Sequence, residues 1–350
     1  MDSIILIPAY KPEAQMTDLV AALAQKNLTV VVVDDGSGAP YRDRFAGVEA
    51  HARLVTCEQN GGKGEALRVG LRYIREHFSP PYSVVTADAD GQHRVKDILR
   101  VARVARRHPE SLVLGCRTVS REMPLRNWFG NFYTKIAFFL ATGRFFRDTQ
   151  TGLRGFSDRM IPYLLGIRGN RYEYETNALL WWGRCGQPIL EVPIRTVYLD
   201  GNSTSHFKAV RDSVRIYAEI LKFSALPFGC FLLDTALFCL LDAFLPLNGV
   251  MLVLANSFAR LGTTALWFSL LYRSGRKHIS DFEIKTPQLL AFAAADWLLN
   301  TAVLWGMIQV ITPLWAKVIA DVLLFFIGLI PQRAVFTPLS RNKKRRGGRA

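Results

Sequence analysis

The chain has 350 residues, of which 50% are hydrophobic and 21% are charged. This composition excludes a disordered chain and is more apolar than that of an ordinary soluble enzyme. The formal net charge of +15 indicates an anionic partner, and the apolar content favours membrane lipid over nucleic acid as that partner.

The cysteines and the N-terminus indicate a reducing, cytoplasmic setting for the first part of the chain. The five cysteines form no CxxC pair and no metal-type spacing, and their odd number argues against a disulfide framework. The first residues, MDSIILIPAYKP, place an acid at position 2 and Pro8 after a short aliphatic run. This pattern favours the first strand of a domain over a signal peptide.

Residues 4 to about 199 alternate short β-branched runs with longer helical patterns, which is typical of an α/β domain with a mainly parallel sheet. Strands are predicted at Ile4–Ile7, Thr29–Val33, Arg53–Thr56, Tyr82–Thr86 and Leu112–Leu114. Helices are predicted between them at Glu13–Gln25, Lys63–His77 and Val95–Arg107. Ligands of such sheets bind at the carboxyl ends of the strands, so the residues that follow each strand are the functional candidates.

Two loops near the start of the chain offer groups for a nucleotide. Asp34-Asp35-Gly36-Ser37, after the second predicted strand, can accept hydrogen bonds from a nucleobase imide or a ribose hydroxyl, although a helix N-cap is the alternative. Asn60-Gly61-Gly62-Lys63-Gly64 brings backbone N–H groups and an ammonium to a helix N-terminus, as phosphate sites do. The spacings of a P-loop and of a dinucleotide GxGxxG motif are both missing, which argues against a nicotinamide enzyme.

Acidic residues follow the fourth predicted strand, in the sequence Asp88-Ala89-Asp90-Gly91-Gln92-His93. An Asp-x-Asp triplet alone is a weak signal, but its position puts it on the ligand edge of the sheet. Its carboxylates are hard oxygen ligands that suit Mg²⁺ or Mn²⁺ bound to a diphosphate, and Gln92 can add a neutral oxygen. A solvated acidic turn is the alternative.

Two stretches combine aromatic with basic side chains, at Pro124–Phe146 and Phe207–Phe223. This mixture suits the headgroup boundary of a membrane, with a pair of core-facing helices as the alternative.

Four hydrophobic segments follow Ala225, at about 225–246, 247–272, 287–311 and 313–336. Each has the roughly 20 residues that a bilayer span requires. The loop 273–286 and the C-terminal tail are basic, so the positive-inside rule puts both on the cytoplasmic side together with the first domain. The sequence therefore predicts a multi-pass protein of the cytoplasmic (inner) membrane that contacts membrane lipid and no nucleic acid.

Ionisable residues inside these segments need a partner or a function. Asp234, Arg260 and Asp296 lie on three different predicted spans at a similar depth. Two interpretations stay open for them, mutual pairing or a contact between Arg260 and a lipid-linked phosphate. Lys317 and Asp321 are four residues apart on one predicted helix and are expected to neutralise each other.

Six motifs occur in order between residue 4 and about residue 220: PAYKPE, VVVDDGS, NGGKGEAL, TADADGQH, DTQTGLRGF and EVPIR. This set resembles the family 2 glycosyltransferases of the GT-A fold, and within them the dolichol- and polyprenyl-phosphate sugar transferases. The four-span remainder, which ends in IPQRAVF before a basic tail, resembles the GtrA-like membrane domain. The resemblance implies a nucleotide-sugar donor, a polyprenyl (undecaprenyl) phosphate acceptor, and a membrane domain that helps the product across.

The resemblance also implies roles for individual residues. The nucleoside would be surrounded by Pro8, Ala9, Tyr10, Asp34 and Asp35, and the metal ion and diphosphate by Asp88, Ala89, Asp90 and Gln92, with Lys63 nearby. The acceptor phosphate would meet Arg117, Arg126 and Arg195, beside a closing loop that contains Asp148 and Gly152. Lys11-Pro12 stands where the family usually has Asn-Glu, so Glu13 receives no role. The QxxRW motif of processive synthases is missing, which favours transfer of a single sugar.

The chemistry implied for such an acceptor needs no catalytic base. A phosphate monoester has a second pKa of about 6, so its oxygen is already an anionic nucleophile that arginines can hold in line with the anomeric carbon. A single displacement inverts that centre, and Glu173 and Glu175 are expected to shape the pocket. Two alternatives remain: a lipid-linked sugar transporter with a nucleotide-sugar-sensing domain, or a membrane-anchored transferase with a hydroxyl acceptor and Glu175 as base.

We predict four regions along the chain: a GT-A domain at 1–206, an amphipathic interfacial helix at 207–224, a GtrA-like four-helix transmembrane domain at 225–337 and a basic cytoplasmic tail at 338–350. The choice between Mg²⁺ and Mn²⁺, the sugar, the nucleotide (UDP or GDP) and the oligomeric state, a homo-oligomer included, all stay open at this level.

Overall fold

The structure is a computed structural model that describes residues 2–117, 135, 138–139, 142, 144–184, 187–195, 228–244, 249–278, 282–284, 286–328 and 336–338. The chain forms two compact units. Unit 1 comprises Met1–Phe138, Phe145–Gly183 and Gln187–Glu219, and unit 2 comprises Phe139–Arg144, Arg184–Gly186 and Ile220–Ala350.

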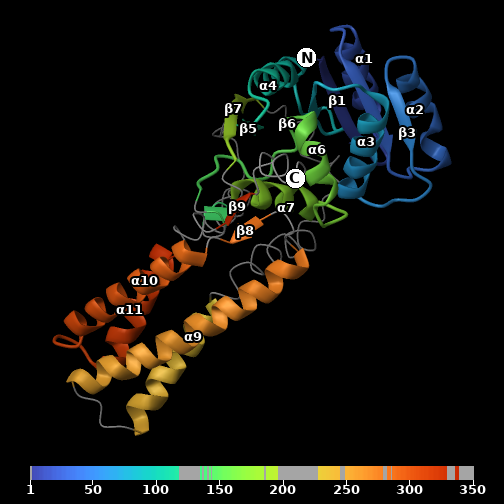
Figure 1. The fold of residues 1–350 in the computed structure, drawn as a ribbon. Coiled ribbons are helices and arrows are strands. Elements are labelled where there is room, and N and C mark those ends of the chain that lie inside the picture. Colours follow the sequence, from blue (N-terminus) through green and yellow to red (C-terminus); the bar gives the residue numbers. More distant parts are fainter. Residues whose placement is uncertain are drawn as a thin grey trace, which may run out of the picture. The chain divides into compact units, whose positions relative to one another are not determined.

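Unit 1 is built on a seven-stranded sheet with the order β3-β2-β1-β4-β6-β5-β7 (Figure 1). The strands are β1 (Asp2–Ala9), β2 (Thr29–Asp34), β3 (Arg53–Thr56), β4 (Tyr82–Thr86), β5 (Leu112–Arg117), β6 (Arg154–Ser157) and β7 (Ile189–Ile194). Neighbouring strands are parallel except for β6, which runs antiparallel to β4 and β5. The predicted α/β class with a mainly parallel sheet is therefore confirmed.

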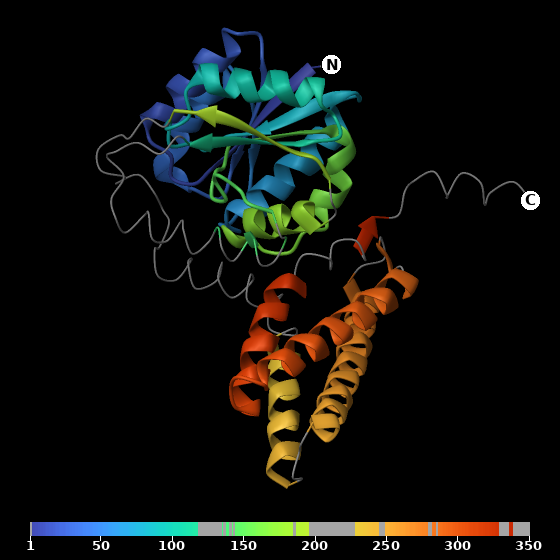
Figure 2. The same cartoon turned by 90° about the vertical axis from the view of Figure 1, so that its left-hand side faces the viewer.

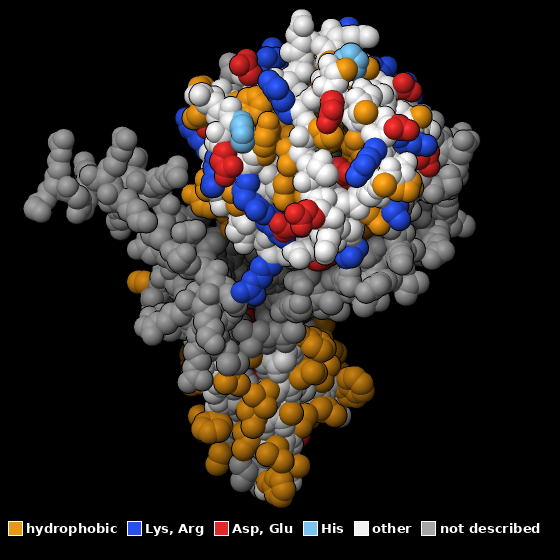
Figure 3. All heavy atoms as spheres, turned by 90° about the vertical axis from the view of Figure 1, so that its right-hand side faces the viewer, with side chains coloured by type: hydrophobic (Ala, Val, Ile, Leu, Met, Phe, Trp, Pro, Cys, Tyr) orange, Lys and Arg blue, Asp and Glu red, His pale blue; other side chains and the backbone are white. Residues whose placement is uncertain are grey.

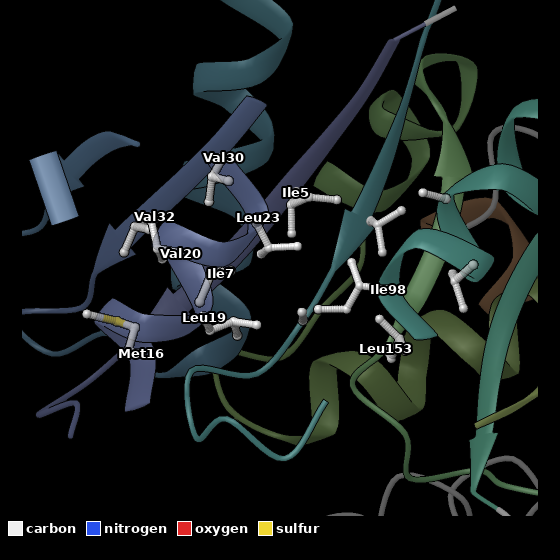
Figure 4. Packing of buried hydrophobic residues seen from close by; sticks show 14 of the residues in the cluster. Ile5, Ile7, Met16, Leu19, Val20, Leu23, Val30, Val32, Ile98 and Leu153 are labelled. Carbon is white, nitrogen blue, oxygen red and sulfur yellow. The ribbon is translucent and has the colours of Figure 1, made fainter. Parts of the chain in front are cut away.

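Helices cover both faces of this sheet (Figures 1 and 2). One core joins the sheet to α1 (Ala14–Ala24), α2 (Arg42–Glu49) and α4 (Val95–Arg107). Figure 4 shows how the α1 side chains Met16, Leu19 and Leu23 meet Ile5 and Ile7 of β1. Strands buried on both faces are continuous hydrophobic runs, which is why β1 and β2 could be read from the sequence.

The opposite face carries α3 (Lys63–His77), with the short helix α6 (Ile161–Leu165) beside it. Gly70 of α3 is set so closely on the sheet that a Cβ there would overlap Leu6 and Val33. Farther along the chain, α7 (Glu173–Arg184) follows α6, and the short 3-10 turns Ala39–Tyr41 and Asp158–Met160 complete the described elements of unit 1.

The strands predicted from the sequence are confirmed at β1 to β5, and the three predicted helices coincide with α1, α3 and α4 within a residue or so at each end. The sequence gave no signal for β6 and β7. The β6 sequence RGFS lacks a β-branched run, and β7 contains Pro193. A proline is tolerated there because β7 is at the edge of the sheet.

Unit 2 has a helix in each of the four predicted hydrophobic segments. These helices are residues 228–244, α9 (Gly249–His278), α10 (Thr286–Met307) and α11 (Pro313–Gly328), and a short hairpin pairs β8 (Phe282–Ile284) with β9 (Phe336–Pro338). Within the described residues, one stretch, Gly249–Leu266 of α9, is long and apolar enough to cross a membrane. The four-span arrangement therefore stays a prediction. The stretches 124–146 and 207–224 and the tail 338–350 lie largely or wholly outside the described residues.

The helices of unit 2 bury polar side chains and expose large apolar ones. Asn256 and Asn300 are fully buried, whereas Phe244, Phe258 and Val310 are 79%, 72% and 84% exposed. Figure 3 shows the same contrast, because hydrophobic side chains dominate the visible surface of these helices while charged side chains of both signs are interspersed over unit 1. This distribution is the reverse of a water-soluble bundle, whose apolar faces turn inward.

The buried charges of unit 2 form one network, which we call the polar network, of Asp234, Arg260, Asp296, Lys317 and Asp321. The Arg260 guanidinium donates to Asp234 at 2.9 Å, to Asp296 at 3.0 Å and to Asp321 at 3.2 Å. The Lys317 ammonium donates to Asp234 at 2.6 Å and to Asp321 at 3.0 Å. Each of the four described helices of the unit contributes at least one charged group.

Mutual pairing is thus confirmed for Asp234, Arg260 and Asp296, as is the pairing of Lys317 with Asp321. The sequence suggested two separate sets, but the structure joins them in one network. A contact between Arg260 and a lipid-linked phosphate finds no support here, because three carboxylates already engage its guanidinium.

The polar network predicts a large effect for a small substitution. Asp234→Asn should lower the free energy of unfolding by about 3 kcal/mol, because it removes the charge that compensates buried Lys317 and Arg260. The matched control is Asp242→Asn on the same helix, for which no ion pair is found within the described residues and which should change stability by less than about 0.5 kcal/mol. Unfolding of the full chain in detergent measures both, and equal effects would contradict the pairing.

Candidate active site

The carboxyl ends of β2, β1 and β4 lie side by side and bring three candidate loops together. Pro8 and Ala9 are buried within the end of β1, and the Ala9 carbonyl accepts the Asp35 N–H at 2.8 Å. The Ala9 side chain belongs to the hydrophobic core, so its contribution to a ligand site would come from the backbone. Tyr10 is partly exposed, and the Lys11 ammonium lies 5.2 Å from its ring centroid.

Asp35 anchors the glycine-rich loop that precedes α3. Its carboxylate accepts the backbone N–H groups of Gly61 and Gly62, each at 2.8 Å, and the amide of Asn60 at 2.9 Å. Burial raises the pKa of Asp35, although the two backbone N–H groups favour its charged form. Gly36 has φ +68°, and a Cβ there would overlap the backbone of residues 59 and 60. The tight packing of the two loops therefore depends on both Asp35 and Gly36.

Asp34 organises its own turn instead. One carboxylate oxygen accepts the Ser37 N–H at 2.9 Å, and the Ser37 hydroxyl accepts the Lys11 N–H at 2.8 Å. These contacts tie the end of β2 to the end of β1. Asp34 is buried, with 7% of its surface exposed.

Lys63, the first residue of α3, bridges two carboxylates. Its ammonium lies 2.6 Å from Asp88 Oδ1 and 2.7 Å from Glu175 Oε2. Burial works against the charged ammonium, but Asp88 and Glu175 together raise the pKa of Lys63 above its ordinary value. We call Lys63, Asp88 and Glu175 the lysine bridge.

Asp88 is engaged through both of its oxygens. Oδ1 contacts Lys63, and Oδ2 lies 3.2 Å from Nε2 of the buried His93. Burial opposes ionisation of this carboxyl, but the positive charge of Lys63 outweighs it and lowers the pKa of Asp88. Gly152 lies so close that a Cβ would overlap the Asp88 carboxylate. The glycine therefore provides the space in which this carboxylate sits.

Asp90 carries the second carboxylate of the acidic loop that follows β4. Burial and the negative charge of Asp88 raise the pKa of Asp90, and a cation between the two carboxylates would relieve that repulsion. Within the described residues there is no group of three or more His, Cys, Asp and Glu side chains that could hold a metal. The protein would thus supply two carboxylates, as in sites where Mg²⁺ takes its other ligands from substrate phosphates and water. Gln92 lies next to this pair, and its backbone N–H donates to Asp90 at 3.0 Å.

The basic residues expected to meet an acceptor come from other strands than the acidic residues. Arg117 ends β5 and Arg195 follows β7, on the far side of the sheet order from β1 and β2. Arg117, at the end of β5, forms a bidentate pair with Asp148, with Nε–Oδ2 at 2.6 Å and Nη2–Oδ1 at 2.9 Å. Burial opposes ionisation of Asp148, but Arg117 holds its pKa below the ordinary value. Arg195 is exposed just after β7, and its backbone N–H donates to Asp97. Arg126 lies outside the described residues.

The arrangement around Glu175 was not predicted from the sequence. Arg154 is buried and donates to the Glu175 carbonyl at 2.6 Å, which fixes the start of α7 against β6. Oε1 of Glu175 is buried and has no hydrogen-bond partner within the described part of the chain. Two acidic residues in RYEYET were a visible signal, but nothing in the sequence linked them to Lys63.

Comparison with known proteins covers mainly unit 1. Residues 4–168 match the family described as Glycosyl transferase family 2. UDP-N-acetylglucosamine–dolichyl-phosphate N-acetylglucosaminyltransferase of Methanococcus voltae is 30% identical over 217 residues, which are 56% of this chain and 86% of that protein. Dolichyl-phosphate beta-glucosyltransferase of Saccharomyces cerevisiae is 24% identical over 254 residues, 62% of this chain and 72% of that protein. A crystal structure of glucosyl-3-phosphoglycerate synthase from Mycobacterium tuberculosis, in complex with Mn²⁺, UDP-glucose and phosphoglyceric acid, is 18% identical, with a TM-score of 0.44 and coverage of 63% of this chain and 79% of that one.

Gly152 provides a test of the site that removes no charged group. Gly152→Ala should displace the Asp88 carboxylate and weaken Mn²⁺ binding by roughly tenfold, about the effect of one weakened charge-assisted contact. Stability should fall by no more than about 1 kcal/mol. Mn²⁺ titration followed by electron paramagnetic resonance measures the first effect and thermal unfolding the second. Gly47→Ala on α2, where a Cβ would make an ordinary contact with Thr17 at 3.4 Å, is the control and should bind Mn²⁺ as the wild type does.

Proposed function

The chain belongs to glycosyl transferase family 2, and on that premise we propose that it transfers a single sugar from a UDP- or GDP-linked donor to polyprenyl (undecaprenyl) phosphate at the cytoplasmic membrane face, with inversion of the anomeric centre. The observation that carries the proposal is the cluster of Asp88, Asp90 and Lys63 at the ligand edge of the sheet. Relatives named for transfer to dolichyl phosphate support the choice of acceptor.

On the donor side, Asp88 and Asp90, with Gln92 beside them, would hold Mg²⁺ or Mn²⁺ against the diphosphate. The bound cation supplies Lewis-acid stabilisation of the departing nucleotide. The loop that Asp35 anchors leads into the N-terminus of α3, where the N–H groups of Gly61 and Gly62 already donate to Asp35. The Lys63 ammonium and the helix dipole are the features there that would favour phosphate. Tyr10 and Asp34 would border the nucleoside.

On the acceptor side, arginines would orient an oxygen that is already anionic. The Asp148 carboxylate fixes the Arg117 guanidinium in one orientation through two hydrogen bonds, and a preorganised group loses less entropy when it binds a phosphate. Arg126 and Arg195 would complete the basic surface. Their charge would attract the phosphate to this side of the site.

A hydroxyl acceptor with Glu175 as base has less support. Oε2 of Glu175 already accepts a hydrogen bond from the Lys63 ammonium, which leaves only the buried Oε1, without a partner among the described residues, to take a proton. A transporter that only senses nucleotide-sugar could bind it through the same Asp88 and Asp90, so release of the nucleotide on turnover is what separates this alternative from transfer. A phosphate acceptor, unlike a hydroxyl acceptor, needs no base.

The exposed apolar surface of unit 2 supports the membrane part of the proposal. Burying apolar surface in hydrocarbon is favourable by roughly 25 cal/mol per Å², and each described helix of unit 2 exposes large apolar side chains, among them Phe244, Phe258, Leu298 and Trp315. In a bilayer, buried polar groups must satisfy one another, as the polar network does. We therefore propose a GtrA-like, four-span domain at 225–337 that anchors the enzyme and aids translocation of its product.

A donor panel tests the transfer reaction. The purified full chain, incubated with UDP- and GDP-hexoses and undecaprenyl phosphate in Mg²⁺ or Mn²⁺, should release one nucleoside diphosphate per lipid-linked sugar. Asp90→Asn should lower kcat by about 100-fold, because it weakens the stabilisation of the leaving group, and EDTA should have a similar effect. Asp43→Asn on α2 is the matched control and should retain wild-type turnover. A folded wild type that uses only soluble hydroxyl acceptors, or turns over fully in EDTA, would refute the proposal.

A spin label at position 258 tests the membrane assignment. Phe258→Cys, labelled in a cysteine-free background and reconstituted in vesicles, should be accessible to oxygen but protected from a water-soluble nickel complex, because this position would face hydrocarbon. Arg72→Cys on α3, where Arg72 is about half exposed, is the aqueous control and should show the opposite preference. If the label at position 258 were as accessible to the nickel complex as the label at position 72, the helix would face water and the membrane assignment would be wrong.

A further inference from the structure

We propose that the Lys63 ammonium competes with the divalent cation for the Asp88 carboxylate, and that Glu175 retains the lysine when the cation takes Asp88. This inference rests on the proposed metal-dependent transfer and adds a coupling between metal and phosphate binding. It concerns three residues that come from different parts of unit 1, namely the start of α3, the loop after β4 and the start of α7.

The first support is that both oxygens of Asp88 are engaged by the protein itself. Lys63 lies 2.6 Å from Oδ1, and His93 Nε2 lies 3.2 Å from Oδ2. A cation that binds Asp88 must therefore displace at least one of these contacts. The lysine is the group that can leave at low cost, because its ammonium has a second carboxylate within hydrogen-bonding distance.

Glu175 is that second carboxylate. Its Oε2 lies 2.7 Å from the same ammonium nitrogen, so Lys63 keeps a charge-assisted hydrogen bond after it loses Asp88. Glu175 itself cannot follow easily, because the buried Arg154 holds its backbone carbonyl at 2.6 Å. The lysine bridge thus has one fixed end at Glu175 and one exchangeable end at Asp88.

The charge balance also suits a divalent ion. Asp88, Asp90 and Glu175 contribute three negative charges when ionised, and Lys63 contributes one positive charge, which leaves two negative charges. A divalent cation would neutralise them, whereas without the lysine the same site would carry three. Because like charges in a partly buried site repel strongly, Lys63 stabilises the cluster until a stronger cation binds.

The exchange would couple the metal to the donor diphosphate. An ammonium released from Asp88 stays at the N-terminus of α3, where the helix dipole favours phosphate. When the cation binds Asp88, Lys63 is released from that carboxylate. The cation and the Lys63 ammonium would then contact the diphosphate together. Glu175 acts here as a positioning residue and not as a base.

Mn²⁺ binding by the full chain in detergent, measured by electron paramagnetic resonance without nucleotide, tests the competition. Lys63→Met should bind Mn²⁺ at least about tenfold more tightly than the wild type, because removal of a charge-assisted competitor is worth roughly one factor of ten or more. Lys63→Gln keeps hydrogen-bond donors for both carboxylates and should change affinity in the same direction if Lys63→Met folds poorly. Lys11→Met is the control, since it removes a positive charge at the same sheet edge whose ammonium lies over Tyr10, and it should alter affinity less than about twofold.

A crystal structure with Mn²⁺ bound gives the direct readout. The Lys63–Asp88 contact should open beyond about 3.5 Å, the limit of a hydrogen bond, while the Lys63–Glu175 contact persists. Unchanged or weaker Mn²⁺ binding in both Lys63 variants, an equal gain in Lys11→Met, or a retained Lys63–Asp88 contact beside a bound ion would overturn the exchange. If the wild type then still transfers sugar with a metal, the proposed function stands without this inference. A folded wild type that binds no Mn²⁺ would overturn both the metal assignment and the exchange.

Discussion

The requirement that buried charges compensate one another shapes the site in unit 1. The Lys63 ammonium lies between Asp88 and Glu175 at 2.6 and 2.7 Å. Each of these groups alone would be costly to remove from water, and together they offset that cost. Lys63 can reach this position only because the loop before it is fixed, and Asp35 fixes that loop through two backbone N–H groups. The loop geometry and the charge cluster therefore depend on each other.

The same requirement applies to unit 2, where charged side chains are buried and large apolar ones are exposed. Arg260 and Lys317 share carboxylates from several helices in the interior, while large side chains such as Phe258 face outward. In water this surface would favour aggregation. In hydrocarbon it would be stable, and unpaired charges would be the costly feature. Helices that must satisfy one another's charges in this way have a specified set of neighbours, which apolar packing alone would define less strictly.

The sequence predicted those strands, helices and loops whose structure is determined by one short segment of the chain. Strands β1 and β4 are hydrophobic on both faces, so their runs were visible, and the acidic loop after β4 was located from its strand. The edge strand β7 was missed because its glutamate and proline dilute the pattern. The pairing of Lys63 with Glu175 could not be predicted from the sequence, because the two residues are far apart in the chain and meet through one contact of the Lys63 ammonium. Asp35 was expected near a nucleoside, and its engagement by a neighbouring loop depends on a tertiary contact.

The character of the two units bears on the choice of acceptor. A polyprenyl phosphate has an ionic phosphate head group on a long hydrocarbon chain. The protein also has two kinds of surface: unit 1 presents mixed charges, and unit 2 presents apolar side chains (Figure 3). A soluble hydroxyl acceptor would use only the first of these surfaces and would also demand a base. Glu175, the obvious candidate, is bound to Lys63. An acceptor that arrives with its own anionic oxygen removes the need for a base and gives the apolar surface a purpose, so a single substrate class accounts for both units.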